Sequence, residues 1–179
     1  MRLLGGEEFD DLDGGVDTLA GYRSVLHGPR PEFRKAGSWQ AELEGVIAEL
    51  KRWPDDSPGA VAVGVPERDQ VPEVVTLLER NGMPATVIGP DGPRRYDAVH
   101  VGTLHRFKGL EYQRIILAGI CDSAIPHPRI EQFRVSDPLR YQRELKRARS
   151  LLFVAATRAR DTLVVSWHGA PSPFLRVAG

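Results

Sequence analysis

Residues 101–117 read VGTLHRFKGLEYQRIIL, where two apolar runs flank a dense group of hydrogen-bonding side chains. Each run extends into a short β-branched stretch, AVHVGTL (98–104) and RIILAGI (114–120), as is typical of strands covered on both faces. In open α/β sheets, ligands bind beyond the carboxyl ends of the strands. The residues between the runs are therefore candidates for a functional loop, and the alternative is a solvated polar loop.

The rest of the chain alternates between strand-like and helix-like patterns. Further strands are predicted at three apolar runs: AVAVGV (60–65), ATVIG (85–89) and TLVVSW (162–167). Helical spacing predicts helices over 38–53 with Ser38 as the N-cap, over a segment that ends before Gly82, and over about 138–160. HGPRPEF (27–33) predicts a turn or an extended connector. Strands alternating with helices predict one domain with a parallel α/β sheet.

The composition is that of an ordinary globular domain, with 179 residues, 41% hydrophobic and 27% charged, and a formal net charge of zero. The charge is unevenly placed, because residues 1–20 carry six acids and one arginine, whereas residues 94–160 carry fourteen Lys and Arg against six acids. A local cluster of cations can bind phosphate even in a neutral chain. The single cysteine, Cys121, excludes an intramolecular disulfide. Without a long apolar segment or a signal-like start, we expect a cytoplasmic protein with no membrane partner.

Two stretches resemble motifs of one protein family. T-L-H-R-F-K-G-L-E-Y (103–112), followed by a strand and AGICDSAIPHP (118–128), resembles motif V of the superfamily 1 DNA helicases of the UvrD/Rep/PcrA type. LLFVAATRARDTLVVS (151–166) resembles their motif VI, and the order and spacing of the two motifs also fit. L-A-G-Y-R-S (19–24) is a weaker match to motif IV, with Gly21 in place of asparagine.

The resemblance covers about residues 19–175 and implies the second of the two motor domains of an ATP-dependent DNA helicase. The implied fold is a three-layer, RecA-like α/β domain with a mostly parallel sheet and helices on both faces. We therefore expect an acidic, Gly-rich segment or linker over 1–18 and a helicase C-terminal domain over 19–179. Only about ten residues, PDGPRRYDAV (90–99), stand where the family carries a large inserted subdomain, which this chain lacks.

The same resemblance implies roles at an ATP site. Arg158, in A-T-R-A, matches the arginine finger that stabilises charge on the γ-phosphoryl group. Arg23, in Y-R-S, matches a second γ-phosphate sensor, and the alternative is an ordinary turn arginine. Glu111 matches a carboxylate that accepts hydrogen bonds from the ribose, and Gly109 allows a close approach of the backbone or a positive φ. The alternative for these two is a turn glycine beside a solvated glutamate.

Four residues of the same loop form its predicted DNA side: Thr103, His105, Arg106 and Lys108. A hydroxyl, an imidazole and two cations can bind phosphate oxygens without reading bases. One short loop would then touch ATP at one end and single-stranded DNA at the other. No metal-ligand spacing surrounds His105, so no metal role is predicted for it.

The chain contains neither a G-x-x-x-x-G-K-[ST] phosphate-binding loop nor a strand that ends in an Asp-Glu pair. In the family both belong to the first motor domain, which also holds the Mg²⁺ of bound ATP. We therefore expect half of an ATP site, no ATP hydrolysis by the chain alone, and two partners: single-stranded DNA and the N-terminal motor domain of the same polypeptide. Two alternatives stay open: a motor-inactive nucleic-acid-binding or regulatory module of the same fold, and an unrelated doubly wound domain that binds a small ligand.

Overall fold

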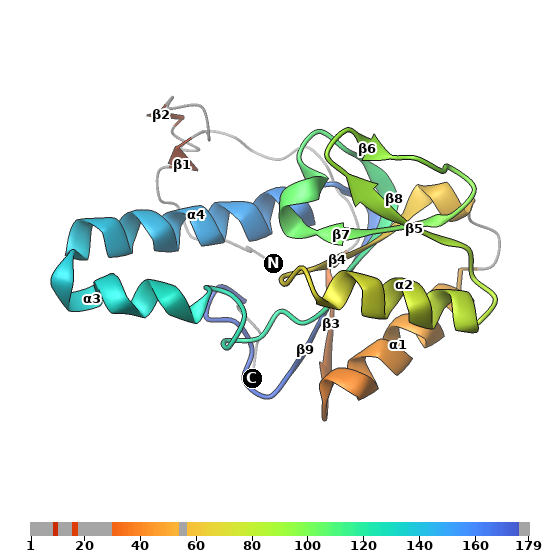
Figure 1. Ribbon diagram of the computed structural model, residues 1–179, viewed down its shortest axis with the longest axis horizontal. Coiled ribbons are helices and arrows are strands. Elements are labelled where there is room, and N and C mark those ends of the chain that lie inside the picture. The colour runs from red at the N-terminus through yellow and green to blue at the C-terminus, as the bar shows by residue number, and fades with distance from the viewer. Residues whose placement is uncertain (1–8, 11–15, 18–29, 54–56, 176–179) are drawn as a thin grey trace.

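The computed structural model describes residues 9–10, 16–17, 30–53 and 57–175 (Figure 1). Its central sheet contains β3 (Glu32–Ala36), β4 (Val61–Val65), β5 (Ala85–Gly89), β6 (Gly92–Pro93), β7 (Val99–Thr103), β8 (Tyr112–Leu117) and β9 (Ala159–His168). The strand order is β3-β9-β8-β4-β7-β5-β6, and only β6 runs antiparallel to its neighbour. A separate antiparallel pair joins β1 (Phe9–Asp10) to β2 (Val16–Asp17).

Helices cover both faces of the sheet. They are α1 (Trp39–Lys51), α2 (Gln70–Arg80), the short α3 (Phe133–Ser136) and α4 (Pro138–Ala156), with single 3-10 turns η1 (Pro58–Ala60), η2 (Leu104–Phe107) and η3 (Pro128–Gln132). Figure 1 shows α1 and α2 on one side of the sheet and α4 on the other. The predicted three-layer α/β architecture, with a mostly parallel sheet and helices on both faces, is confirmed.

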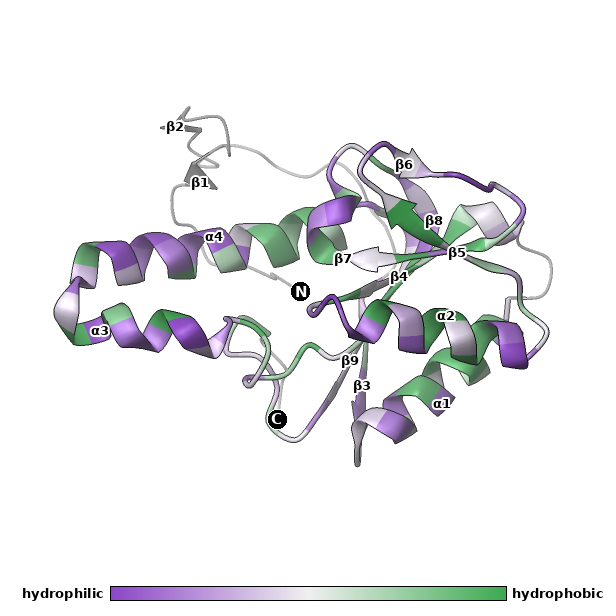
Figure 2. Ribbon diagram, in the orientation of Figure 1, coloured by the Kyte–Doolittle hydropathy of each residue, from purple (hydrophilic) through white to green (hydrophobic). Residues whose placement is uncertain are grey.

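The central strand β4 explains the two cores. Its alternate residues point to opposite faces, so Val63 joins the cluster under α1 and α2 while Ala62 joins the cluster under α4. Both residues are fully buried, because β4 is covered on each side. Figure 2 shows the same division, with hydrophobic residues lining the inner side of α1 and α2 and concentrated in the second half of α4.

One strand differs from its prediction. The connector expected over 27–33 gives way at Glu32 to β3, which pairs in parallel with β9 from Glu32 opposite Val164 to Ala36 opposite His168. The sequence EFRKA lacks a continuous apolar run because β3 is an edge strand of the sheet and is bonded on one side only. Ser38 does cap α1, since its side chain accepts a hydrogen bond from the Ala41 N–H at 3.2 Å.

A buried carboxylate ties α1 to the carboxyl ends of β8 and β9. Glu42 is only 2% exposed, and its Oε2 accepts hydrogen bonds from the Gly119 N–H at 2.8 Å and the Ser166 hydroxyl at 2.6 Å. Its Oε1 lies 2.5 Å from Nδ1 of His168. Three partners compensate for the burial of the carboxylate and fix the position of the helix against the sheet.

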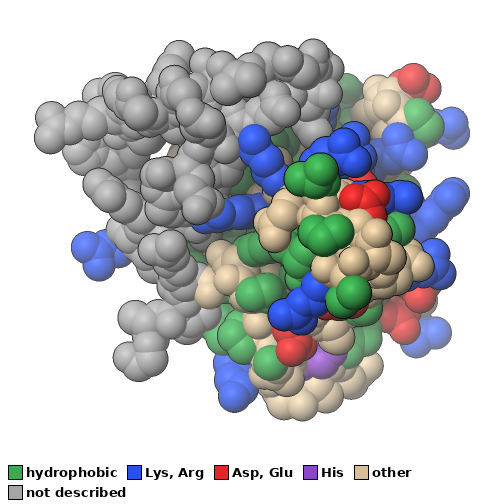
Figure 3. All heavy atoms as spheres, turned by 90° about the vertical axis from the view of Figure 1, so that its left-hand side faces the viewer, with side chains coloured by type: hydrophobic (Ala, Val, Ile, Leu, Met, Phe, Trp, Pro, Cys, Tyr) green, Lys and Arg blue, Asp and Glu red, His purple; other side chains and the backbone are tan. Residues whose placement is uncertain are grey.

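A hairpin of α3 and the first half of α4 projects from the sheet (Figure 1). The Tyr141 hydroxyl donates to Glu131 at 2.9 Å, and the Arg140 guanidinium lies 3.9 Å from the centre of the Phe133 ring. Two large apolar side chains remain 90% and 78% exposed near the tip: Val135 and Leu139. In Figure 3, which looks onto this end of the molecule, Lys and Arg side chains lie close to hydrophobic ones. Within the described residues, no helix combines the length and apolar character needed to cross a membrane.

Replacing Glu42 with alanine should lower the free energy of unfolding by about 3 kcal/mol, because the Gly119 N–H and the Ser166 hydroxyl would lose a charged, buried partner. Chemical denaturation measures this change. Glu44→Ala on the same helix is the matched control, since Glu44 is exposed, and it should change stability by less than about 0.5 kcal/mol. Equal stability of the two variants would contradict a structural role for the buried carboxylate.

Candidate functional site

The site is organised by a segment that crosses one face of the sheet. Strands β7 and β8 are parallel, and β4 lies between them. The chain leaves β7 at its carboxyl end and must enter β8 at its amino end, so residues 104–111, here called the crossing segment, run the full length of the strands. Its two ends therefore lie at opposite edges of the sheet. We call these the carboxyl edge, where the parallel strands end, and the amino edge, where they begin.

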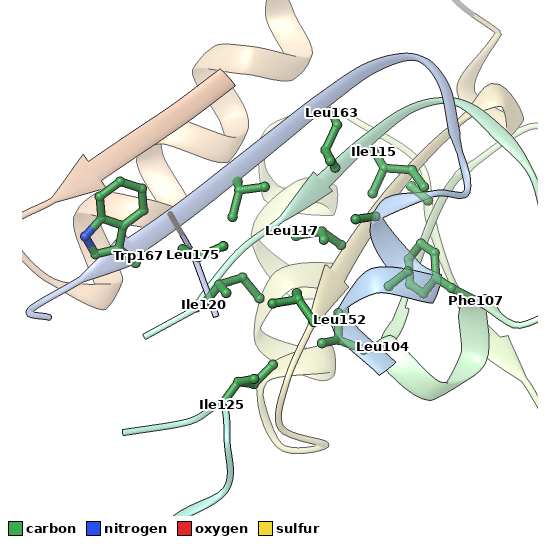
Figure 4. Packing of buried hydrophobic residues seen from close by; sticks show 14 of the residues in the cluster. Leu104, Phe107, Ile115, Leu117, Ile120, Ile125, Leu152, Leu163, Trp167 and Leu175 are labelled. Carbon is green, nitrogen blue, oxygen red and sulfur yellow. The ribbon is translucent and has the colours of Figure 1, made fainter. Parts of the chain in front are cut away.

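Two apolar side chains hold the crossing segment in the core. Leu104 and Phe107, both in η2, are 1% and 0% exposed and belong to the cluster beneath α4. Figure 4 shows Leu104 beside Leu152 of α4, with Phe107 farther along the same cluster. Gly64 of β4 makes the close approach possible, because a Cβ there would lie 3.2 Å from the Phe107 ring and 2.8 Å from Leu117 Cδ2.

The carboxyl edge carries most of the predicted DNA-contacting residues. Thr103 ends β7 opposite Val65 and is half-buried. His105 and Arg106 follow within the turn of η2, and both are exposed. Lys108 is also exposed and comes directly after η2, on the crossing segment itself. The structure thus groups a hydroxyl, an imidazole and a guanidinium at the end of one strand, with an ammonium group farther along.

The amino edge brings the two family-like motifs together. Gly109 has φ +79°, in the left-handed region, and an added Cβ would meet no atom within 4 Å, so the backbone conformation is what requires glycine. Glu111 is exposed and directly precedes Tyr112, whose N–H donates to the Arg158 carbonyl at 2.9 Å. This main-chain bond places Glu111 and Arg158 at the same edge, although they come from different motifs.

The Arg158 side chain lies against the end of α4. Its Nε donates to the Val154 carbonyl at 3.2 Å, and one terminal nitrogen donates to the Thr157 hydroxyl at 3.4 Å. The Thr157 hydroxyl in turn donates to the Val154 carbonyl at 3.0 Å. The guanidinium is therefore oriented by the last turn of the helix while the residue stays half-exposed.

A buried histidine, which sequence reasoning missed as a site component, supports this edge. Nε2 of His100 lies 2.6 Å from the Arg95 carbonyl, which can only accept, so Nε2 carries the proton. Nδ1 then accepts from the Tyr112 hydroxyl at 3.0 Å. Burial lowers the pKa of His100 and raises that of Tyr112, so both stay neutral and keep this bond at neutral pH. A histidine inside the apolar run AVHVGTL was the signal available in the sequence.

Some predicted features lie outside the described residues. Arg23 and the motif over 19–24 are among them, as is most of the segment over 1–18. Within the described ranges, no group of three His, Cys, Asp or Glu side chains is placed to hold a metal ion.

The fold and the paired motifs define a RecA-like helicase domain, and comparisons with known proteins specify which one. Residues 90–170 match the model of the UvrD-like helicase C-terminal domain. The chain is 30% identical over 171 residues to the ATP-dependent DNA helicase UvrD1 of Mycobacterium tuberculosis, and equally to UvrD1 of Mycobacterium bovis. These matches support a UvrD-like helicase C-terminal domain in this chain, with residues 90–170 as the part that the family model matches.

The match to UvrD1 covers 89% of this chain and 21% of the relative, so the chain spans about a fifth of the length of these curated relatives. Among solved structures, the fold is similar to the C-terminal domain of a possible DNA helicase from Lactobacillus plantarum, with a TM-score of 0.62. That similarity covers 88% of this chain and 93% of the other at 20% sequence identity, and it supports the RecA-like fold.

Gly64→Ala should destabilise the domain by about 1–3 kcal/mol, because the new methyl group would push against Phe107 and Leu117 in a closely packed core. Gly45→Ala is the matched control, since a Cβ at this α1 position meets nothing within 4 Å. It should raise stability by up to about 1 kcal/mol through helix propensity. Thermal or denaturant unfolding measures both changes in stability. An unchanged stability of Gly64→Ala would contradict the close packing of the crossing segment against β4.

Proposed function

We propose that this chain is the second of two RecA-like motor domains of an ATP-dependent DNA helicase. It would bind single-stranded DNA at the carboxyl edge of its sheet and complete an ATP site at the amino edge. The observation that carries the proposal is the crossing segment, which joins Thr103 at one edge to Glu111 at the other. The names of the curated relatives, ATP-dependent DNA helicases, support the choice of nucleotide and nucleic acid.

At the amino edge, Arg158 would serve as the arginine finger. Hydrolysis develops negative charge on the γ-phosphoryl oxygens, and a guanidinium supplied from a neighbouring domain stabilises it. The hydrogen bonds from Arg158 to Val154 and Thr157 leave other N–H donors of this planar group for a phosphate. Glu111 would accept hydrogen bonds from the ribose hydroxyls, next to the backbone turn at Gly109. Arg23 is the second proposed γ-phosphate sensor.

The proposed phosphate contacts come from Thr103, His105 and Arg106 at the carboxyl edge and from Lys108 farther along the crossing segment. Such contacts hold a strand without reading its sequence, which suits an enzyme that moves along DNA. Exposure of His105, Arg106 and Lys108 leaves these side chains accessible to the strand. The affinity of the domain for DNA should fall steeply as the salt concentration rises, because each neutralised phosphate releases counterions.

The buried turn between the two edges gives a physical route for coupling. Leu104 and Phe107 are enclosed by the sheet and α4, so the crossing segment can move only together with its surroundings. A displacement of Glu111 by the bound nucleotide would therefore also displace Thr103 and change its contact with the DNA strand. Closing and opening of two motor domains would repeat this change once per ATP.

The remaining half of the ATP site is assigned to a first motor domain of the same polypeptide. That domain would supply the phosphate-binding loop and hold the Mg²⁺, for which this chain has neither motif. The chain alone should therefore not hydrolyse ATP. A cytoplasmic location is part of the same proposal.

In a polypeptide that joins this chain to a first motor domain, Arg158→Ala should reduce DNA-stimulated ATP turnover by roughly 10³–10⁵, as the loss of an arginine finger does. Nucleotide affinity should stay nearly unchanged, because the finger acts mainly on the transition state. Steady-state turnover and equilibrium binding of a fluorescent ATP analogue give the two values.

Arg160→Ala is the control, because Arg160 is an exposed arginine at the start of β9 in the same motif. It should leave turnover within about twofold of the parent, because no contact with ATP is proposed for it and a surface substitution usually changes stability by about 0.5 kcal/mol or less. Equal turnover of Arg158→Ala and the parent would remove the finger assignment. It would also favour the alternative of a motor-inactive module.

A further inference from the structure

The hairpin formed by η3, α3 and the first half of α4 extends beyond the carboxyl edge of the sheet. We call residues 128–147 the arm. Helix α4 has 19 residues, which span roughly 28 Å, whereas the five residues of β7 and the six of β8 span roughly 17–20 Å. The helix ends near the amino edge, two residues before Arg158, so its first turns lie past the carboxyl edge, as Figure 1 shows.

Side-chain contacts hold the arm together as one unit. The Tyr141 hydroxyl of α4 donates to the Glu131 carboxylate of η3 at 2.9 Å. Asp137 caps α4 by accepting from the Arg140 N–H, also at 2.9 Å. The Arg140 guanidinium lies 3.9 Å from the centre of the Phe133 ring. The arm therefore presents its surface in a fixed shape, which reduces the entropy lost when a partner binds.

The tip of the arm is apolar and open to solvent. Val135 is 90% exposed and Leu139 is 78% exposed, on either side of the turn at Asp137 that joins α3 to α4. Two side chains are too small an apolar area for a stable protein interface, which buries on the order of 800 Å² of each partner. They are large enough to pack against a base pair, as apolar side chains do in proteins that unstack DNA.

A stripe of arginines connects this tip to the carboxyl edge. Arg140, Arg143 and Arg147 are exposed and follow one another along one face of α4, at spacings of three and four residues. At the inner end of the stripe, Arg147 lines a groove of about 420 Å³ together with His105 and Glu67, beside the end of β7. The stripe is thus continuous with the proposed contacts to the single strand.

The charge of the arm suits a phosphate backbone. Residues 128–147 carry six Lys and Arg against three acids, whereas the whole chain is neutral. The three acids are engaged within the arm, in the two hydrogen bonds above and in a contact of Glu144 with Arg147 at 3.4 Å. A guanidinium has five N–H donors, so the contact of Arg140 with the Phe133 ring leaves donors for a phosphate.

We propose that the arm binds the DNA duplex at the point where the duplex adjoins the single strand held at the carboxyl edge. This inference rests on the proposed function. The arginine stripe contacts phosphates of the duplex, and Val135 and Leu139 pack against its terminal base pair. A duplex exposes a flat apolar surface only at its end, so the tip is specific for the junction, while the stripe binds any phosphate backbone.

The test uses the chain itself and three fluorescently labelled DNAs: a single strand, a blunt duplex, and a duplex that continues into the same single strand. Anisotropy measures the affinities over a range of salt concentrations. The junction should bind about tenfold more tightly than the single strand at low salt, which is the scale of three phosphate contacts. The plot of log affinity against log salt concentration should be steeper for the junction by roughly 2.7, because each contact adds about 0.9.

The role of the tip is tested with 2-aminopurine in the terminal base pair of the junction, since its fluorescence responds to a change in stacking. Binding of the parent chain should change this fluorescence. The double variant Val135→Ser and Leu139→Ser should leave the fluorescence unchanged and bind the junction roughly fivefold more weakly, with the same affinity for the single strand. Val87→Ser is the matched control, because Val87 is a 49% exposed valine of β5 outside the arm, and it should behave like the parent.

Equal affinities and equal salt dependence for the junction and the single strand would overturn the role of the arm and leave the proposed strand contact intact. Binding of none of the three DNAs would contradict the proposed function and the arm together. Unchanged 2-aminopurine fluorescence with the parent chain would overturn the contact of the tip with the base pair. A dimer in sedimentation that Val135→Ser dissociates would assign the tip to a second copy of the chain and also overturn the proposal.

Discussion

The architecture of the site depends on one topological constraint. Strands β7 and β8 are parallel and flank β4, yet only residues 104–111 join them. A connection this short cannot include a covering helix, so it must cross the sheet face directly beneath α4. Burial of Leu104 and Phe107 stabilises that path, and Gly64 provides the space for it. Opposite ends of one motif are thereby fixed at opposite edges of the sheet.

Helix α4, which covers the crossing segment, also positions Arg158. Leu152 of α4 packs in the cluster with Leu104, and the helix ends at Ala156, two residues before the arginine. The main-chain bond between Tyr112 and Arg158 then joins the start of β8 to the start of β9. The proposed nucleotide contacts, Glu111 and Arg158, are thus positioned by core packing and by backbone hydrogen bonds.

The sequence predicted the buried strands of the sheet well and its edge strand poorly. AVAVGV and ATVIG correspond to β4 and β5, because strands covered on both faces need continuous apolar runs. The edge strand β3 was missed, since EFRKA shows no such run. Glu42 and His100 were also missed as structural elements, because their partners, such as Ser166 and Tyr112, are distant in sequence. Motif residues of the site were predicted by resemblance, whereas the groove lined by Glu67, His105 and Arg147 brings together residues that are distant in sequence, which no local pattern reveals.

The central claim is that one segment links the amino edge, which is proposed to bind ATP, to the carboxyl edge, which is proposed to bind single-stranded DNA. The direct measurement is the affinity for single-stranded DNA of a polypeptide that joins this chain to a first motor domain, with and without a non-hydrolysable ATP analogue. The reverse measurement takes the affinity for the analogue with and without DNA. Linkage requires the same factor in both directions, and we predict a factor of about five or more. Independent binding of the two ligands would contradict the account.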